Sequence, residues 1–320
     1  MFRKLFFMSL GLLLVLVILS GCVSKTRDKT VPHENRWGIY SLDIFTQEVE
    51  LIYSSGEMIS GLKMNPPKGR FVFSQRIGGD DDGQEEICVI GADGSGFMQL
   101  TNNSVIDTYP TWSPDGSRIA FLSWRDHDLD VYVMESDGGG VAKLYNSGFH
   151  DADIDWVGNK IVFTRNSQIW IMDDNGDSAR QVSNFSIAGV WGKANLPFGD
   201  YDPRLSPDGN KIVFSRLSAD TSEHGNYDFY LINPDGSGET SLTSDSQTQG
   251  LPGWSPLGDK IVYVVAAIND TGMYDIYLMN SDGTNNQDIT PSYFPPTFLC
   301  HSTIFSKDGS KLFFVGEWWA

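Results

Sequence analysis

The stretch Trp112-Ser-Pro-Asp-Gly-Ser-Arg-Ile-Ala-Phe121 returns at regular intervals along this chain of 320 residues. Three close copies and two weaker ones begin at Leu205, Trp254, Phe305, Met64 and Trp156. In chain order the six starts are 48, 44, 49, 49 and 51 residues apart. A fixed period of this size indicates a repeat fold, so the sequence predicts six structural units.

Each unit is predicted to contain four short strands. The Pro-Asp-Gly triplet favours a turn, because Pro presets φ, Asp hydrogen-bonds its own backbone and Gly accepts a positive φ. An alternating strand such as 119–123 follows, then a third strand such as 130–134, and then an Asp-Gly or Asn-Gly hairpin turn such as Asp137-Gly138. The fourth strand ends in Leu-Thr or a related pair, as at Leu100-Thr101. This pattern predicts the blade of a β-propeller.

The two ends of the chain are predicted to share one blade. The sixth unit contributes only two strands, while residues 37–42 and 48–53 match a third and a fourth strand. We therefore predict an all-β fold over residues 36–320. It is a six-bladed β-propeller of four-stranded antiparallel blades, whose last blade is closed by the N-terminal strand pair. This closure would remove two open sheet edges.

Residues 1–21 have the composition of an export signal. The basic pair Arg3-Lys4 precedes an apolar stretch over 5–19, and the segment ends in Leu19-Ser-Gly-Cys22. These four residues resemble the lipobox of bacterial and archaeal lipoproteins, which implies cleavage before Cys22, lipidation of Cys22 and a tether over 22–35. The alternative is an uncleaved anchor, although 15 apolar residues are short for a membrane span. Both interpretations predict an extracytoplasmic protein anchored to a membrane, in a periplasm or at the cell surface.

The charge and the cysteines narrow the environment further. The net charge of −18 becomes −20 if Arg3 and Lys4 are removed with the signal. Such a chain is unsuited to nucleic acid and to anionic lipid headgroups, and is better suited to cations, basic protein surfaces or neutral ligands. Cys88 and Cys300 could pair in an exported protein, but their predicted strand positions differ, which favours two free buried thiols.

The repeat Trp-Ser-Pro-Asp-Gly-x-(Arg/Lys)-Ile-x-Phe, with a later Ile-Tyr-x-Met-x-x-Asp-Gly and Leu-Thr, resembles the TolB-type, WD40-like propeller repeat over residues 36–319. The resemblance implies the fold strongly and the function weakly, because one fold hosts many functions. TolB places a small α/β domain before its propeller, whereas about a dozen tether residues precede it here. We therefore expect a TolB-like propeller lipoprotein without that domain.

One face of the propeller is the predicted binding surface. The loops that enter each first strand share this face with the loops that join second to third strands, and they are long, irregular and charged. The candidate partner-surface residues are Asp80, Asp81, Asp82, Trp124, His127, Trp191 and His301.

Acidic residues recur at the start of the first strands, which line the channel of a propeller. Asp107, Asp151 and Asp200 stand five residues before their anchors, and Asp153 and Asp202 stand three before. Strand alternation predicts that all five point into the channel mouth. Clustered carboxylates repel unless a cation or a base lies among them, so a Ca²⁺ site is one hypothesis and a hydrated acidic funnel is the other.

The expected function is a non-catalytic platform that binds other envelope or surface proteins or a ligand, with the membrane reached only through the lipid and with no nucleic acid bound. No nucleophile–base pair stands at a useful spacing, and the motif residues Asp115, Asp208 and Asp308 are expected to serve turns. The alternative is a polysaccharide-binding or polysaccharide-active propeller, in which exposed tryptophans and the channel-mouth carboxylates would contact the glycan.

Overall fold

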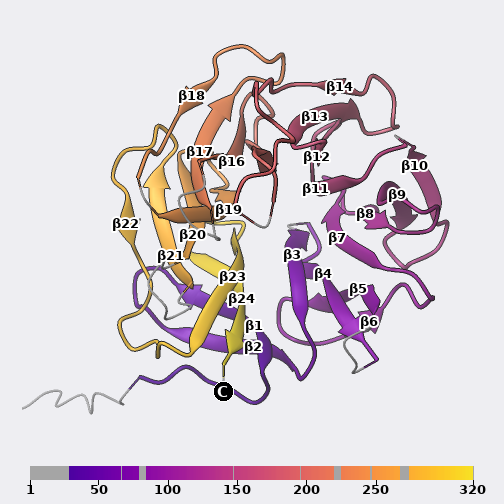
Figure 1. The fold of residues 1–320 in the computed structure, drawn as a ribbon. Helices are drawn as coiled ribbons and strands as arrows, with labels where there is room; N and C mark the ends of the chain where they lie inside the picture. The colour runs from indigo at the N-terminus through magenta and orange to yellow at the C-terminus, as the bar shows by residue number, and fades with distance from the viewer. Residues whose placement is uncertain are drawn as a thin grey trace, which may run out of the picture. The chain divides into compact units, whose positions relative to one another are not determined.

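The computed structural model describes residues 29–65, 67–78, 84–146, 148–194, 196–219, 225–245, 247–266 and 274–319. The predicted lipidation site Cys22 and the predicted partner residues Asp80, Asp81 and Asp82 lie outside these ranges. Val31–Ala320 form one compact unit. Within the described residues, 24 strands form six antiparallel four-stranded sheets around a central axis, which confirms the predicted six-bladed propeller (Figure 1).

The strands repeat in the same order from blade to blade. The innermost strands are β3 (Ile59–Asn65), β7 (Asp107–Trp112), β11 (Asp151–Val157), β15 (Gly199–Leu205), β19 (Thr248–Trp254) and β23 (Phe298–Phe305). The second strands are β4 (Arg70–Ile77), β8 (Arg118–Ser123), β12 (Lys160–Arg165), β16 (Ile212–Ala219), β20 (Lys260–Ala266) and β24 (Lys311–Trp318). The third strands are β5 (Gln84–Gly91), β9 (Asp130–Glu135), β13 (Gln168–Asp173), β17 (Asn226–Ile232), β21 (Tyr274–Asn280) and β1 (Trp37–Asp43). The outermost strands are β6 (Met98–Gln99), β10 (Ala142–Tyr145), β14 (Arg180–Gln181), β18 (Thr240–Ser241), β22 (Gln287–Asp288) and β2 (Val49–Ser55).

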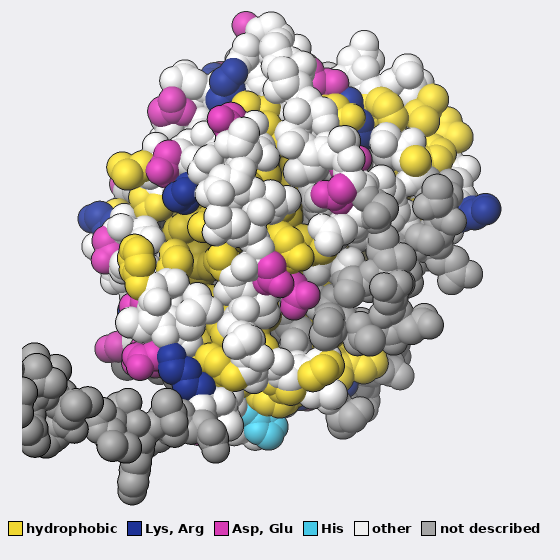
Figure 2. All heavy atoms as spheres, turned by 90° about the vertical axis from the view of Figure 1, so that its left-hand side faces the viewer, with side chains coloured by type: hydrophobic (Ala, Val, Ile, Leu, Met, Phe, Trp, Pro, Cys, Tyr) yellow, Lys and Arg dark blue, Asp and Glu magenta, His cyan; other side chains and the backbone are white. Residues whose placement is uncertain are grey.

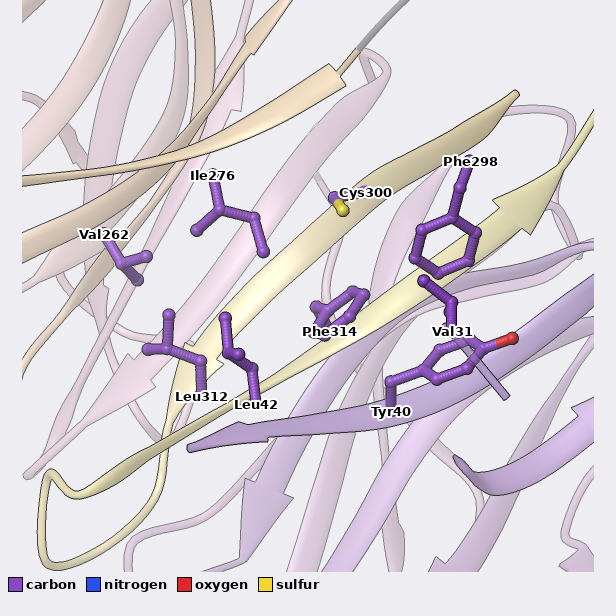
Figure 3. Packing of buried hydrophobic residues seen from close by; sticks show 9 residues of the cluster. All are labelled: Val31, Tyr40, Leu42, Val262, Ile276, Phe298, Cys300, Leu312 and Phe314. Atoms are coloured by element: carbon purple, nitrogen blue, oxygen red, sulfur yellow. The ribbon is translucent and has the colours of Figure 1, made fainter. Parts of the chain in front are cut away.

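The N-terminal strands close the last blade, as predicted. The strand order in this sheet is β2-β1-β24-β23, and β1 pairs with β24 from Trp37 opposite Glu317 to Asp43 opposite Lys311. Figure 3 shows Tyr40 and Leu42 of β1 packed among side chains of the C-terminal strands. The Tyr40 ring stacks on Phe314 with 5.4 Å between ring centroids. Burial of these large side chains joins the two ends of the propeller.

The Ser-Pro-Asp-Gly turns are closed by their own side chains. Asp115 Oδ1 accepts hydrogen bonds from Ser113 Oγ at 2.7 Å and from the Ser117 amide at 3.0 Å. These donors lower the pKa of Asp115 to about 2. Asp208 and Asp308 accept equivalent hydrogen bonds. All three motif aspartates therefore have the turn-forming role expected of them.

The Leu-Thr motif also has a structural role. Thr101 Oγ1 accepts the amide of Ile87 at 2.8 Å, and Thr243 Oγ1 accepts the amide of Phe229 at 2.8 Å. Each hydroxyl satisfies a third-strand amide just beyond the two residues that form the outermost strand. The threonine thus stands in for a backbone partner where the strand pairing ends.

The face that carries the loops entering β3, β7, β11, β15, β19 and β23 is called the loop face below, and the face of the Ser-Pro-Asp-Gly turns is called the turn face. Seen from the side in Figure 2, acidic side chains are spread over the blades and do not gather in one patch. No helix in the described residues is both long and apolar enough to span a membrane.

Candidate functional site

The inner strands are interrupted at the same position in every blade. Three residues before each anchor, the backbone has a positive φ between 49° and 63°, at Gly61, Tyr109, Asp153, Asp202, Leu251 and Ser302. The pairing with the second strand shifts register at this point in all six blades. Such a bulge breaks the alternation of side chains, so residues before and after it do not follow one simple in–out pattern.

The structure therefore places the first three predicted channel aspartates elsewhere than alternation predicts. Asp107, Asp151 and Asp200 are fully buried inside their blades. Arg165 donates two hydrogen bonds to Asp151, at 2.8 and 3.1 Å. Arg216 does the same for Asp200, and Arg125 donates to Asp107 at 2.8 Å. These carboxylates are neutralised within the blade and do not converge on the channel mouth.

Asp153 and Asp202 lie on neighbouring blades and connect them. The amide of Asp202 donates to Asp153 Oδ2 at 3.3 Å, and the Asp202 carboxylate in turn accepts the amide of Leu251 on the next blade. Burial and the nearby Asp153 carboxylate raise the pKa of Asp202 well above its usual range. Each side chain satisfies an amide that the neighbouring bulge leaves unpaired, which is a structural role that the sequence pattern did not reveal.

A cavity of about 650 Å³ follows the inner strands. Its lining includes Met58 and His301 toward the loop face, and Pro256 and Lys307 toward the turn face. It is therefore the central channel. Among its lining residues the charged side chains are Lys63, Arg204, Lys307 and Asp155, so cations outnumber carboxylates. The predicted acidic lining is not what this part of the structure shows.

An ion pair crosses the channel between blades that are not neighbours. Lys63 Nζ on β3 lies 2.7 Å from Asp155 Oδ1 on β11, and Asp155 Oδ2 accepts the amide of Leu205 on β15 at 3.1 Å. Burial, with the Arg204 guanidinium nearby, lowers the pKa of Lys63 to about 8. The pair joins three blades and is neutral as a unit.

The described residues contain no group of three or more His, Cys, Asp or Glu side chains placed to hold a metal ion. The Ca²⁺ hypothesis required the five aspartates to share one site. Their carboxylates instead bind arginines inside blades or amides of the next blade. The alternatives that the sequence left open were a Ca²⁺ site and a hydrated acidic funnel, whereas in the structure the five carboxylates are paired with arginines or backbone amides.

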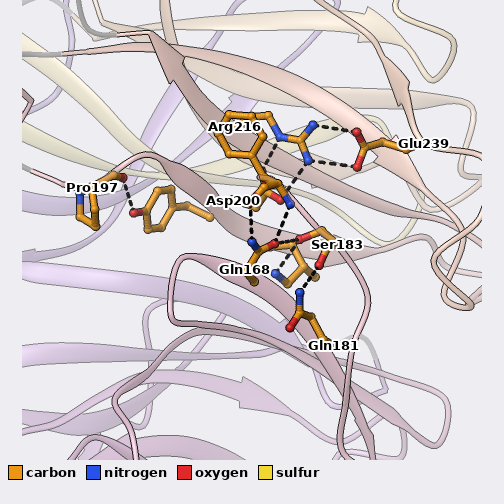
Figure 4. A network of polar contacts seen from close by, with 10 residues as sticks. Gln168, Gln181, Ser183, Pro197, Asp200, Arg216 and Glu239 are labelled. Atoms are coloured by element: carbon orange, nitrogen blue, oxygen red, sulfur yellow. Dashed lines mark hydrogen bonds and ion pairs between the residues drawn. The ribbon is translucent and has the colours of Figure 1, made fainter. Parts of the chain in front are cut away.

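On the loop face, the segment 184–198 between β14 and β15 is firmly held at its base. Figure 4 shows the polar network beneath it, in which Arg216 bridges Asp200 and Glu239. Gln168 donates to the carbonyl of Phe185 at 3.0 Å and accepts the Phe185 amide at 3.1 Å. The Arg216 guanidinium also lies over the Phe185 ring, 4.6 Å from its centroid.

The far end of this segment exposes apolar side chains. Trp191 is 68% exposed and Val190 is 53% exposed, although the backbone there is fixed by hydrogen bonds between Val190 and Phe198 and between Gly189 and Phe198. Ile187 and Leu196 are exposed in the same segment. We call residues 187–194 and 196 the apolar tip. Large apolar side chains held out in solvent by an ordered base are typical of an interaction surface.

Other predicted partner residues lie at separate places on the loop face. Trp124 is exposed and stacks on His150 with 4.8 Å between ring centroids, while His127 is exposed and adopts a positive φ of 75°. His301 is part of the channel lining, and its ring centroid lies 5.7 Å from that of Trp37 and 5.1 Å from that of Tyr274, with Glu317 Oε2 3.3 Å from its Nε2. The structure therefore does not gather the predicted partner residues into one cluster.

Cys88 and Cys300 are buried free thiols, which agrees with the favoured interpretation of the sequence. They belong to different hydrophobic clusters. Burial raises the pKa of Cys88 to about 12 and that of Cys300 well above its usual range. Neither thiol is placed to act as a nucleophile.

The chain folds as a six-bladed β-propeller, an architecture that solved TolB structures share. Residues 32–190 match the family described as TolB beta propeller domain. Over 213 residues the chain is 27% identical to an uncharacterized protein of Agrobacterium fabrum, a match that covers 63% of this chain and 68% of that protein. It is 28% identical over 137 residues to a TolB homolog of Chlorobium luteolum, which covers 41% of this chain and 29% of the homolog.

Solved structures show the same architecture. The propeller superposes on a structure described as putative TolB from Agrobacterium tumefaciens with a TM-score of 0.66 and 17% identity, over 89% of this chain and 99% of that one. The protein is a TolB-like six-bladed β-propeller. At this identity the likeness concerns the fold.

Proposed function

We propose that this protein is an extracytoplasmic platform, anchored by a lipid on Cys22, that binds another envelope or surface protein through the loop face and catalyses no reaction. One observation carries the proposal. The apolar tip exposes Trp191 and Val190 on a segment whose base is fixed by buried charges. Exposing these side chains to water is unfavourable in isolation, so a partner that covers them would gain their burial.

The rigid base strengthens the argument for binding. A loop that is ordered before a partner arrives loses less conformational freedom on binding than a flexible one. Tryptophan is also among the residues that contribute most at protein interfaces. The net charge of −18 favours a partner whose surface around the contact is neutral or basic.

In-cell photocrosslinking tests the contact. A photoreactive amino acid at position 191 is expected to give a discrete adduct with one protein. Position 257 is the matched control, because Leu257 is 88% exposed but lies in a turn on the turn face. The additional change Val190→Ser is expected to weaken the adduct formed from position 191. Absence of an adduct at position 191, or the same adducts from both positions, would contradict the proposal.

A separate experiment tests the anchor. Mass spectrometry of the membrane fraction should find a mature N-terminus at Cys22 that carries lipid, and Cys22→Ser should release the protein from membranes. Recovery of a chain that still begins at Met1 would refute the lipid anchor and leave the interaction surface to be judged by crosslinking alone.

A further inference from the structure

We propose that the central channel is a second binding site, which accepts a small molecule with a carboxylate on an apolar body. The site is independent of the loop-face platform. It rests on the size of the channel, its apolar walls and a guanidinium inside it that forms no salt bridge with a carboxylate of the described residues.

The size and the walls suit a small amphipathic ligand. The channel volume of about 650 Å³ lies in the range of ligand pockets, about 300–1,000 Å³. Much of the lining is apolar, with Leu62, Ile154, Leu251 and Ile304 contributed by four different blades. Walls of this kind bind an apolar body by removing it from water, while a few polar groups fix its orientation.

Arg204 is the polar group in the channel that would favour an anionic ligand. Its Nη1 donates to the carbonyls of Pro203 at 2.7 Å and Asp153 at 3.4 Å. In the described part of the chain, no carboxylate forms a salt bridge with Arg204, and no hydrogen bond is made by its Nε or Nη2. A guanidinium with donors available matches the two oxygens of a carboxylate.

The surrounding charges leave room for that carboxylate. The one carboxylate of the channel lining, Asp155, is already paired with Lys63. Asp153 and Asp202 lie one step toward the loop face. Burial and the neighbouring Asp153 carboxylate raise the pKa of Asp202 to about 7, although Arg204 acts to lower it, so Asp202 carries only part of a full negative charge near neutral pH. Lys307 adds a further cation toward the turn face.

Because the whole chain is strongly acidic, long-range attraction would not by itself bring an anion here. An anion that binds must be recognised locally.

Calorimetry with the full-length protein tests the proposal. The probes are decanoate and a hydrophobic tripeptide with a free C-terminal carboxylate, since either a fatty acid or a peptide end could supply this chemistry. Decanol and the amidated tripeptide are the neutral controls. At least one carboxylate probe is expected to bind at least ten times more tightly than its control, and its binding should weaken as salt is raised.

Three variants locate the site. Arg204→Gln should weaken binding of the carboxylate probe at least tenfold, whereas Arg118→Gln, which changes an arginine that is about one-third exposed and lies outside the channel, should leave it unchanged. Ile304→Trp, which fills the channel without touching a charge, should also abolish binding. It keeps the test decisive if Arg204→Gln does not fold. Binding of neither carboxylate, equal binding of the neutral controls, or binding that survives both channel changes would overturn the proposal.

Discussion

Removing the arginine beneath the apolar tip, by Arg216→Met, should destabilise the propeller strongly. Arg216 Nε and Nη2 lie 2.6 and 3.0 Å from the two oxygens of Asp200, which is fully buried, and its Nη1 lies 2.7 Å from Glu239. Methionine keeps an unbranched apolar side chain but leaves the Asp200 carboxylate without its countercharge. Breaking a buried pair from one side costs about 3–5 kcal/mol, so the free energy of unfolding should fall by about that amount.

The loss should depend on pH in a defined direction. Burial raises the pKa of Asp200 even with Arg216 present, and removal of the arginine should raise it further. When the pKa of a carboxyl group is raised in the folded state, the free energy of unfolding falls as the pH rises from the unfolded-state pKa toward the folded-state pKa. The destabilisation by Arg216→Met should therefore be larger at pH 8 than at pH 5. Adding Asp200→Asn, which removes the unpaired charge, should recover most of the loss.

Urea unfolding followed by circular dichroism measures these changes as shifts in midpoint at constant slope. The matched control is Arg118→Met, because Arg118 and Asp174 are both about one-third exposed and 3.5 Å apart. An exposed pair of this kind contributes about 0–1 kcal/mol. Equal losses from Arg216→Met and Arg118→Met, or no recovery in the double variant with Asp200→Asn, would refute the assigned role of the buried pair.

Three further experiments, two substitutions and one chemical labelling, probe other parts of the fold. Asp202→Asn should raise the melting temperature at pH 8.5 and have little effect at pH 4, because the wild-type carboxyl has a raised pKa and is costly when ionised; an equal effect at both pH values would contradict this. Thr243→Val should cost about 1–3 kcal/mol in urea unfolding, because the buried amide of Phe229 loses its acceptor, whereas the same change at the exposed threonine of β18 should cost far less. Cys88 and Cys300 should resist iodoacetamide in the folded protein and react after unfolding, since both are buried and their pKa values are raised; labelling of either under native conditions would show that its strand opens.

The fold could be predicted from sequence because its signals are local. Each Ser-Pro-Asp-Gly turn is closed by hydrogen bonds within five residues, as between Ser113 and Asp115, so the tetrapeptide carries its own structure. Counting the repeats, including the copies that depart from this tetrapeptide, gives the six blades, and the unpaired strands at the two ends imply the closure of the last blade. None of these steps requires knowledge of contacts between distant residues.

The channel could not be predicted in the same way, because its geometry depends on a bulge that five different residue types occupy. A glycine such as Gly61 signals a positive φ, but Tyr109 and Leu251 adopt it with no sequence signal. The alternation of side chains fails at this bulge. Applying it to residues on the far side of the bulge wrongly places the carboxylate of Asp151 in the channel. Its pairing with Arg165 follows from the register of β11 and β12, which the sequence does not display.

The sequence predicts Trp191 as a partner residue because it lies outside the repeat pattern. The structure shows why the amino acid at such a position can differ without loss of the fold. On the turn face, the turns at Asp115, Asp208 and Asp308 are closed by motif side chains, so a change there would remove a structural hydrogen bond. On the loop face, buried pairs such as Asp200 with Arg216 hold the start of the inner strand and the base of the loop from within the blade. The exposed side chains of Trp191 and Val190 lie outside these contacts. A propeller built in this way can change what its loop face binds without changing the blades beneath it.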